Sequence, residues 1–207
     1  MSFDVALRHR IGERAIELAF ASDARLTALV GPSGAGKTTV LNCIAGLIRP
    51  DGGHVVVGGT VLFDASDGTD LAPERRRAGY VFQDLRLFPH LRVAANLAYG
   101  ERLARPGERW IGRHAVTELL GIGHLLERWP ATLSGGEMRR AAIGRTLLAA
   151  PRFLLLDEPF ASLDRERAEA LMGLVERIRD ELEVPILLVS HDRAEVERLA
   201  GRVVTLD

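Results

Sequence analysis

The spacing of hydrophobic and polar positions divides the chain into short strands and amphipathic helices. The first thirty residues alternate loosely between apolar and polar around a turn at Gly12–Glu13, which predicts an antiparallel hairpin. The run Leu26–Val30 is continuously apolar and stops at Gly31, which is typical of a buried strand that ends in a glycine-rich loop. A helix is expected next, over Lys37–Ala45.

Short strands alternate with helices in most of the remaining chain. Short β runs are expected at Val55–Val57 and Val61–Phe63, and another that ends at Phe82. After residue 134 the expected elements are a helix at Gly136–Ala149, a strand at Phe153–Leu156, a helix at Arg165–Leu182, a strand at Ile186–Ser190 and a strand at Val203–Leu206. This alternation predicts an α/β fold with a mostly parallel sheet that is covered on both faces.

The middle of the chain has a different pattern, one of short helical pieces. Its breaks are Pro89, Pro106, Gly121, Gly123 and Pro130. We therefore expect a helical subdomain at about 84–134, inserted into one α/β domain. The core of that domain is formed by about 1–83 and 135–207, and the first of these also carries an antiparallel β subdomain.

Composition narrows the class of protein. The net charge of −1 argues against a polybasic nucleic-acid binder, and the single cysteine, Cys43, excludes an internal disulfide and is expected to be a small buried apolar side chain. The first residues are charged, and no apolar run approaches 18 residues. The sequence therefore predicts a soluble cytoplasmic chain without a signal peptide. Lys37 is the only lysine among 27 basic residues.

Residues 31–38 read GPSGAGKT and predict a phosphate-binding loop between a strand and a helix. Glycines let backbone N–H groups approach phosphate oxygens, and the helix start adds its dipole. Lys37 is expected to reach the β- and γ-phosphates, Thr38 to bind Mg²⁺, and Thr39 to support the phosphate shell. The alternative is an ordinary glycine-rich turn, which the placement of the only lysine disfavours. The predicted nucleotide-binding residues here are Gly31, Pro32, Ser33, Gly34, Ala35, Gly36, Lys37, Thr38 and Thr39.

Two acidic residues follow the buried strand Phe153–Leu156. Asp157 is expected at the carboxyl tip of that strand, where α/β folds bind ligands, and suits a Mg²⁺ contact. Glu158 projects differently and could polarise an attacking water as a general base. The alternative is a charged loop after a strand.

A set of motifs resembles the ABC-type ATPases, a family of P-loop NTPases, over essentially the whole chain. The residues are LSGGE at 133–137, followed by MRRAAIGRTLLAAPRFLLLDEPFASLD. They are similar to the family's signature motif, Walker B strand and D-loop in order and spacing. The resemblance adds Gln83, in GYVFQD, as the Q-loop residue and His191, in LLVSHD, as the switch histidine.

The resemblance implies how these residues act. The signature residues would form a second anion site that serves the partner subunit, so that two copies of the chain clamp two ATP head to tail. His191 would donate to the γ-phosphate and Gln83 would touch Mg²⁺ or the water. The implied residues of the second site and the dimer axis are Ser134, Gly135, Gly136, Glu137 and Asp164.

Residues 74–100 look like the importer branch of the family, in which about Leu85–Val93 receives a coupling helix of the membrane permease. The preceding DASDGTDLAPERRR is similar to the ATPase subunit of molybdate and tungstate importers, while sulfate, thiamine and iron importers share much of the pattern.

Three departures from the family pattern stand out. Glu137 replaces the commoner Gln, although Glu does occur in this branch and activity is expected. Ile11 stands where an aromatic residue usually stacks on adenine, so base stacking is expected to be either weak or supplied by His9 or Arg10, and the choice between ATP and GTP stays open. The chain reaches only Asp207, so regulation by an oxyanion-binding domain is not expected within this polypeptide.

We therefore expect the ATP-hydrolysing, Mg²⁺-dependent subunit of a bacterial importer of molybdate or a similar oxyanion. It would work as a homodimer under permease subunits, with a solute-binding protein as an indirect partner, at the cytoplasmic face of the inner membrane. Alternatives are an importer ATPase for another solute, a soluble ABC ATPase that engages nucleic acid or the ribosome, and a small-molecule P-loop kinase. The last is disfavoured by LSGGE.

Overall fold

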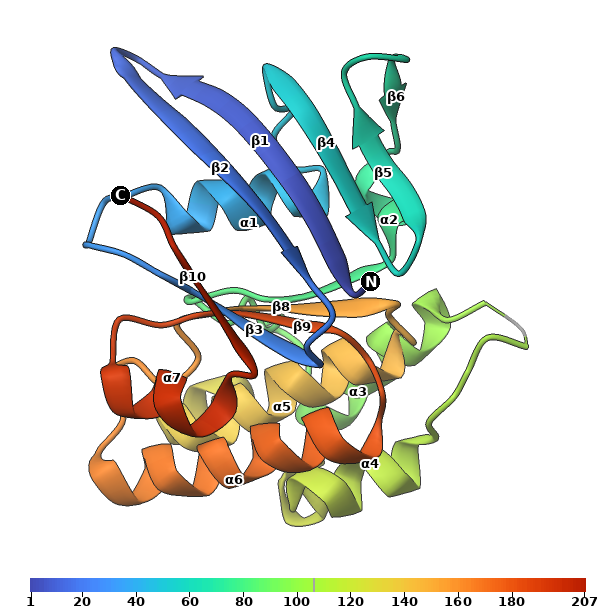
Figure 1. Ribbon diagram of the computed structural model, residues 1–207. Helices are drawn as coiled ribbons and strands as arrows, with labels where there is room; N and C mark the ends of the chain where they lie inside the picture. The colour runs from blue at the N-terminus through green and yellow to red at the C-terminus, as the bar shows by residue number, and fades with distance from the viewer. Residues whose placement is uncertain (106) are drawn as a thin grey trace.

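The computed structural model describes residues 1–105 and 107–207. Pro106, one of the predicted breaks in the helical segment, lies outside the described residues. Figure 1 shows two sheets stacked with helix α1 between them and the other long helices beneath the second sheet.

The first sheet is antiparallel and has the strand order β2-β1-β4-β5-β6. Its strands are β1 (Phe3–Ile11), β2 (Arg14–Ser22), β4 (Gly52–Val57), β5 (Thr60–Asp64) and β6 (Thr69–Asp70). In β2 the buried residues alternate with exposed ones, so only one face of this hairpin strand packs on the core. The predicted hairpin is thereby confirmed.

The second sheet is parallel and has the order β10-β3-β9-β8-β7. Its strands are β3 (Leu26–Val30), β7 (Ala78–Val81), β8 (Phe153–Asp157), β9 (Ile186–Val189) and β10 (Arg202–Thr205). All residues of β8 and β9 are buried, as continuous apolar runs in a doubly covered parallel sheet should be. The predicted α/β fold is confirmed.

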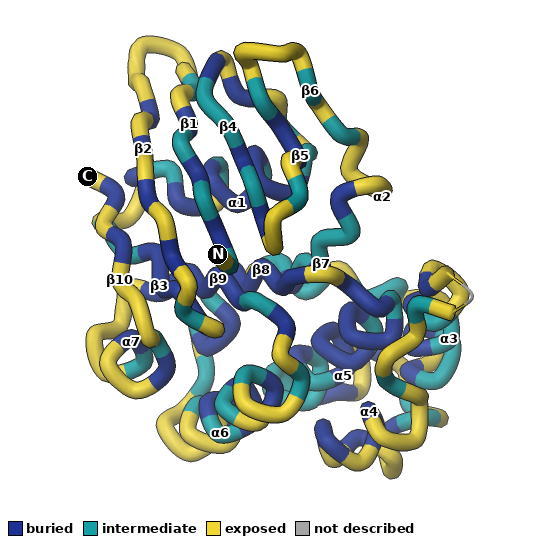
Figure 2. The backbone as a smooth tube through the Cα atoms, turned by 45° about the vertical axis from the view of Figure 1, so that its right-hand side comes forward, coloured by how far each residue is buried: buried dark blue, intermediate teal, exposed yellow. Residues whose placement is uncertain are grey.

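The faces of the parallel sheet belong to two hydrophobic cores. Phe153 and Leu155 of β8 pack with α1 (Lys37–Ala45) and the antiparallel sheet, whereas Leu154 and Leu156 pack with the helices below. This alternation follows from the period of two in a strand. Figure 2 shows the buried residues concentrated along α1, the parallel sheet and α5.

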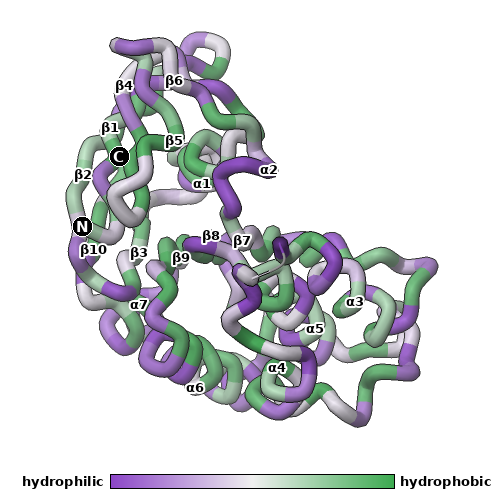
Figure 3. Tube along the Cα trace, turned by 90° about the vertical axis from the view of Figure 1, so that its right-hand side faces the viewer, coloured by the Kyte–Doolittle hydropathy of each residue, from purple (hydrophilic) through white to green (hydrophobic). Residues whose placement is uncertain are grey.

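Helices cover the lower face of the parallel sheet and its β7 edge. They are α3 (Val93–Leu103), α4 (Arg113–Leu120), α5 (Gly135–Leu148), α6 (Arg165–Glu181) and α7 (Arg193–Leu199), with the short turns η1 (Gly123–Leu125) and η2 (Pro130–Thr132). Figure 3 shows α3 and α4 on the side of the parallel sheet away from β10. None of the helices in the described part of the chain has the length and apolar character needed to cross a membrane.

Three short elements were missed from the sequence: β6, α7 and α2 (Pro73–Arg76). The two-residue β6 carries no periodic signal, and α2 is one turn that begins at a proline. Cys43 is buried in α1 as expected, and burial raises the pKa of its thiol to about 12.

Candidate functional site

The carboxyl edge of the parallel sheet gathers the predicted site. Across this edge the neighbouring strands are β3, β9, β8 and β7. Because they are parallel, the loops that follow them emerge side by side. These loops carry the phosphate-binding loop after β3, His191 after β9, Glu158 after β8 and Gln83 after β7.

The phosphate-binding loop is closely surrounded at two of its glycines, Gly31 and Gly36. A Cβ at Gly36 would collide with the Ile16 side chain of β2, and one at Gly31 would collide with the Leu206 carbonyl group. Gly36 also has φ 104° and serves as N-cap of α1 without any side-chain hydrogen bond. The first N–H groups of α1 are therefore not capped by the side chain of the N-cap residue and suit an anion.

Lys37 lies inside this loop, with only 5% of its surface exposed. Its ammonium donates to the carbonyl oxygens of Gly31 and Pro32, each at 2.9 Å. Both acceptors are neutral, so they position the ammonium without neutralising its charge. The other predicted loop residues differ in exposure: Pro32, Ser33, Gly34 and Thr38 are exposed, Thr39 is half-buried and Ala35 is buried.

The three predicted metal ligands, Thr38, Gln83 and Asp157, line one hollow of about 340 Å³. Asp157 is 3% exposed, and its Oδ1 has no hydrogen-bond partner among the described residues. Its Oδ2 accepts a long bond of 3.5 Å from the Tyr80 hydroxyl. Burial raises the pKa of Asp157, and the neighbouring Thr38 hydroxyl opposes that rise.

An unpartnered buried carboxylate oxygen is costly unless an ion or water satisfies it. One carboxylate with a threonine hydroxyl fits Mg²⁺, which commonly takes one or two carboxylates and completes its shell with waters and substrate phosphates. No group of three or more His, Cys, Asp or Glu side chains in the described residues could hold a metal by itself. The residues present therefore fit Mg²⁺ held jointly with a bound nucleotide.

Glu158 is the centre of a second cluster, beside the metal candidates. Its carboxylate lies 3.5 Å from Nδ1 of His191 and accepts from Nε2 of Gln83 at 3.4 Å. Three loops that are distant in sequence thus place their predicted catalytic residues together. Glu158 also has a positive φ of 46°, which costs a non-glycine residue about 1–3 kcal/mol and is common at functional sites.

The loop that presents His191 is anchored on both sides. The Ser190 hydroxyl donates to Glu195 at 2.5 Å and accepts from the Asp192 N–H at 3.0 Å. Asp192 caps α7 by accepting from Ala194 N–H. Burial raises the pKa of Glu195. The histidine side chain itself is 60% exposed, so it projects from a fixed loop.

Sequence reasoning missed Ser190 and Glu195. The spacing Asp192-x-x-Glu195 at the start of a helix was the available signal, since it matches a capping pattern.

The signature residues begin α5 and form a complete capping box. Ser134 is the N-cap, and its Oγ accepts from the Glu137 N–H at 3.4 Å. The Glu137 carboxylate accepts from the Ser134 N–H at 2.7 Å and lies 3.3 Å from Arg128. These contacts, led by the backbone hydrogen bond, lower the pKa of Glu137. Its negative charge is therefore committed to its own helix and to Arg128.

The signature residues do not join the phosphate-binding loop of the same chain. No hydrogen bond or ion pair in the described ranges links residues 134–137 to residues 31–39. Figure 1 shows α5 and α1 on opposite faces of the parallel sheet. Asp164 is separate from both as well, since it caps α6 through the Arg167 N–H and pairs with the Arg167 side chain at 3.2 Å.

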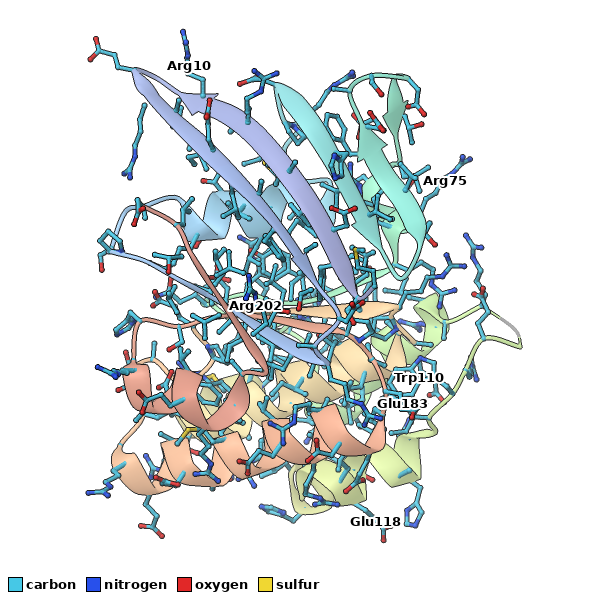
Figure 4. All side chains as sticks on the ribbon, in the orientation of Figure 1. Arg10, Arg75, Trp110, Glu118, Glu183 and Arg202 are labelled. Carbon is cyan, nitrogen blue, oxygen red and sulfur yellow. The ribbon has the colours of Figure 1, made fainter. Side chains whose placement is uncertain are left out.

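The tip of the first hairpin lies beside the phosphate-binding loop. Ile11 is 48% exposed and faces Arg14 in the strand register. Arg14, which sequence reasoning missed, donates to the Gly34 carbonyl at 2.5 Å. His9 instead lies 3.6 Å from Asp51, and Arg10 points away from the molecule (Figure 4). Of these side chains, Arg14 is the one that contacts the phosphate-binding loop.

The predicted docking segment, Leu85–Val93, lies between β7 and α3. Phe88 contacts Tyr99 edge to face at 4.7 Å, and the Arg145 guanidinium lies 5.1 Å from the Phe88 ring. Arg145 also donates to the Leu85 and Arg86 carbonyls. The segment is therefore held by α5, the helix that begins with the signature residues.

Comparisons with known proteins agree with this arrangement. The sequence model of the ABC transporter family matches residues 16–161. The chain is 56% identical over 206 residues to the "Molybdenum import ATP-binding protein ModC" of Mesorhizobium japonicum, and 51% identical over 203 residues to the protein of that name from Rhodospirillum rubrum. The matches cover 100% and 98% of this chain but 56% and 55% of those relatives, so the chain spans about half their length.

Among solved structures, the dimeric post-hydrolysis state of the ATP-binding cassette MJ0796 bound to ADP and Pi superposes with a TM-score of 0.79. It is 26% identical, and the match covers 99% of this chain and 94% of that one. A second dimeric structure of MJ0796, described as a bacterial ABC transporter cassette, gives a TM-score of 0.75.

Proposed function

The chain belongs to the ABC transporter family, and from this premise we propose that it binds ATP and hydrolyses it. The observation that carries the proposal is the contact of Glu158 with Gln83 and His191 at the sheet edge that also holds Lys37 and Asp157. This constellation unites a phosphate cradle, a fitting metal site and a candidate base.

Binding would rest on the loop at 31–39. The uncapped N–H groups at the start of α1 would receive phosphate oxygens, and the dipole of that helix would favour their negative charge. The Lys37 ammonium would exchange its carbonyl acceptors for the β- and γ-phosphates. Arg14, which contacts Gly34 of the loop, would lie against the nucleotide in place of the aromatic residue that the family usually carries at the position of Ile11.

Hydrolysis would rest on the residues around Glu158. Thr38, Asp157 and Gln83 would hold Mg²⁺, which neutralises charge on the transferred phosphoryl group when it is bound. Glu158 would orient and polarise the attacking water, and His191 would donate to the γ-phosphate. The contacts with Gln83 and His191 would hold the Glu158 carboxylate in position, so little reorganisation would be needed at the moment of reaction.

A second copy of the chain would complete each site. The anion-binding start of α5 has no contact in the described residues with the phosphate-binding loop of its own chain, which leaves it for a nucleotide bound to a partner. The dimeric structures of MJ0796 support this arrangement. Two nucleotides would then be clamped between two head-to-tail subunits.

The process that the ATPase drives would be molybdate import. The identity of 50% or more to proteins named for molybdenum import supports this choice over sulfate, thiamine or iron. Membrane subunits would dock near Leu85–Val93, where a segment held by α5 connects them to the signature residues. The subunit would thus lie at the cytoplasmic face of the inner membrane, held there by its partners.

The decisive test of the ATPase proposal is Glu158→Gln. This substitution keeps the size and hydrogen-bonding reach of the side chain but removes its basicity. We expect the hydrolysis rate to fall by about 100-fold or more while ATP binding persists and ATP converts the variant to a stable dimer. Turnover at the rate of the unmodified protein would refute the assignment of the base.

The solute is tested separately, by reconstituting the protein with its membrane subunits and binding protein. Molybdate and tungstate should stimulate ATP hydrolysis, whereas sulfate, thiamine and iron should not. Stimulation by sulfate alone would overturn the solute assignment and leave the ATPase assignment intact.

A further inference from the structure

Arg139 lies directly beneath the signature residues, a position that the proposed function does not use. It follows Gly135 by one helical turn on α5 and is 7% exposed. A Cβ built on Gly135 would lie 3.6 Å from Nη1 of Arg139. The guanidinium therefore packs against the backbone whose N–H groups form the second anion site.

The charge of Arg139 has no counter-charge in the described parts of the chain. No carboxylate there forms an ion pair with it, and its buried Nε has no hydrogen-bond partner. Burial lowers the pKa of the guanidinium, yet an arginine stays protonated in proteins. A buried charge is strongly unfavourable unless it is paired, so this environment suits the arrival of an anion.

Within the described residues, the one side-chain hydrogen bond of Arg139 leads toward the catalytic cluster. Its Nη2 donates to the carbonyl oxygen of Ala161, in the turn between β8 and α6. The N–H of Ala161 in turn donates to the carbonyl oxygen of Glu158 at 3.1 Å. A continuous path of two hydrogen bonds thus joins the signature helix to the residue with the strained φ of 46°.

We propose that Arg139 is a positioning residue that responds to the terminal phosphate of a nucleotide held by a second copy of the chain and fixes the turn that carries Glu158. The phosphate would bind the N–H groups of Gly135 and Gly136, and its negative charge would be the counter-charge that the guanidinium beneath them lacks. Nucleoside triphosphates would engage it, whereas a diphosphate would not reach it. The proposal rests on the proposed function, since it requires the ATP-bound dimer.

The consequence is communication between the two sites of the dimer. A γ-phosphate held on one subunit would pair with the charge of Arg139 on the other subunit. Through the hydrogen bonds of Arg139 with Ala161 and of Ala161 with Glu158, this pairing would stabilise the turn that carries Glu158. The nucleotide bound to one subunit would therefore affect the position of Glu158 in the other subunit. Such coupling predicts positive cooperativity in ATP.

The test compares Arg139→Gln and Arg139→Lys with Arg177→Gln. Arg177 is half-exposed on α6 and pairs with Glu181, so its loss controls for net charge. ATP-driven dimerisation is measured by analytical ultracentrifugation in proteins that also carry Glu158→Gln. The rate, KM and Hill coefficient for ATP are measured with Glu158 intact, and thermal unfolding is followed for every variant.

For Arg139→Gln we expect ATP binding to the monomer within about twofold of the unmodified protein, dimerisation weakened about tenfold, and a Hill coefficient that falls toward one. Arg139→Lys should restore most of the dimerisation, because it keeps the charge, but not the rate, because it cannot keep the guanidinium's contact with Ala161. Arg177→Gln should match the unmodified protein in all three measurements.

A purely structural role would lower the unfolding temperature of Arg139→Gln and leave dimerisation and cooperativity unchanged, which would overturn the proposal. Should Arg139→Gln fail to fold, Arg139→Lys decides alone: normal dimerisation with a reduced rate supports the proposal, and a normal rate refutes it. If the Glu158→Gln protein with Arg139 intact does not dimerise with ATP, the proposed function fails instead.

Discussion

Two helices of this protein begin at loops that we propose bind phosphate, and they begin in opposite ways. Helix α1 starts at Gly36, in the left-handed region, with no side-chain cap and no acidic residue in its first turn. Helix α5 starts at Ser134 with a full capping box and an acidic residue, Glu137, in its first turn. The N-terminal dipole is therefore left open in α1 and partly satisfied by the chain itself in α5.

The cations follow the same division. Lys37 is buried within the loop of α1, and its ammonium donates hydrogen bonds only to neutral carbonyl groups. Its positive charge is therefore available to an anion in this loop. In α5, Arg128 pairs with Glu137, and Arg139 lies beneath the loop rather than at its mouth. Under the proposed function, this difference means that the first loop would bind phosphate strongly within one chain. The second loop would bind phosphate only when another copy of the chain presents it.

Removal of Lys37 should have the largest effect of the substitutions considered. Lys37→Ala deletes the one cation in the loop of α1, and we expect ATP affinity or hydrolysis to fall by about 100-fold or more. Lys37→Arg should lose nearly as much, because the planar guanidinium does not fit where a compact ammonium is enclosed by the loop. Equilibrium binding of a fluorescent ATP analogue and a phosphate-release assay measure both effects.

The matched control is Arg49→Ala, which removes an equal charge from a side chain that is 68% exposed and pairs weakly with Asp70. It should bind ATP normally. If Lys37→Ala also bound and hydrolysed ATP at nearly the normal rate, the phosphate cradle at 31–39 would be misplaced.

The open loop was predictable from the sequence because its chemistry is local. The spacing of Gly31, Gly36 and Lys37, and the apolar run before them, determine a strand, a turn and a helix start within fifteen residues. The buried strands β8 and β9 were predictable for the same reason, since continuous apolar runs need no partner to be recognised.

What the sequence could not provide depends on contacts between distant segments. Arg14 reaches Gly34 because the hairpin tip lies over the loop, and Arg139 reaches Ala161 because α5 lies beneath the turn after β8. Nothing in the local sequence distinguishes these two arginines from the arginines that lie on the surface. The ion pair of Glu137 with Arg128 was equally hidden, although the spacing Ser134-x-x-Glu137 matches a capping box and could have indicated the hydrogen bond with Ser134.

Loss of the cap on α5 should have an intermediate effect. Ser134→Ala removes the Oγ that accepts from the Glu137 N–H and that would face the partner's phosphate. We expect a loss of about 1 kcal/mol in the free energy of unfolding, the usual effect of an N-cap. We also expect ATP hydrolysis and ATP-driven dimerisation to fall by about 10-fold, with normal ATP binding by the monomer.

Thr132→Ala is the control for this prediction, because that nearby hydroxyl donates only to the Trp129 carbonyl. Chemical denaturation, sedimentation and the hydrolysis assay should separate the two variants. If Ser134→Ala weakened ATP binding by the monomer as strongly as Lys37→Ala, the two loops would serve one nucleotide within one chain, and the comparison would fail.

The smallest effect is expected for Glu137→Gln, which changes how the free energy of unfolding depends on pH. Glutamine can still accept from the Ser134 N–H, so the capping box survives and only the contact with Arg128 loses its charge. At pH 7 the free energy of unfolding should change by no more than about 0.5 kcal/mol, as for a partly exposed ion pair. ATP-driven dimerisation should strengthen by about two- to threefold, since one negative charge leaves the second anion site.

The sign of the pH dependence follows from the lowered pKa of Glu137. A carboxyl whose pKa is lower in the folded chain stabilises it above the pKa of the unfolded chain, about 4.3. That contribution disappears as the pH falls through the lower, folded-state value. Urea unfolding at pH 7 and pH 3.5 should therefore show the unmodified protein losing more stability on acidification than Glu137→Gln. Equal losses would mean that the Glu137 carboxylate is not held by Ser134 and Arg128, and that α5 begins as openly as α1.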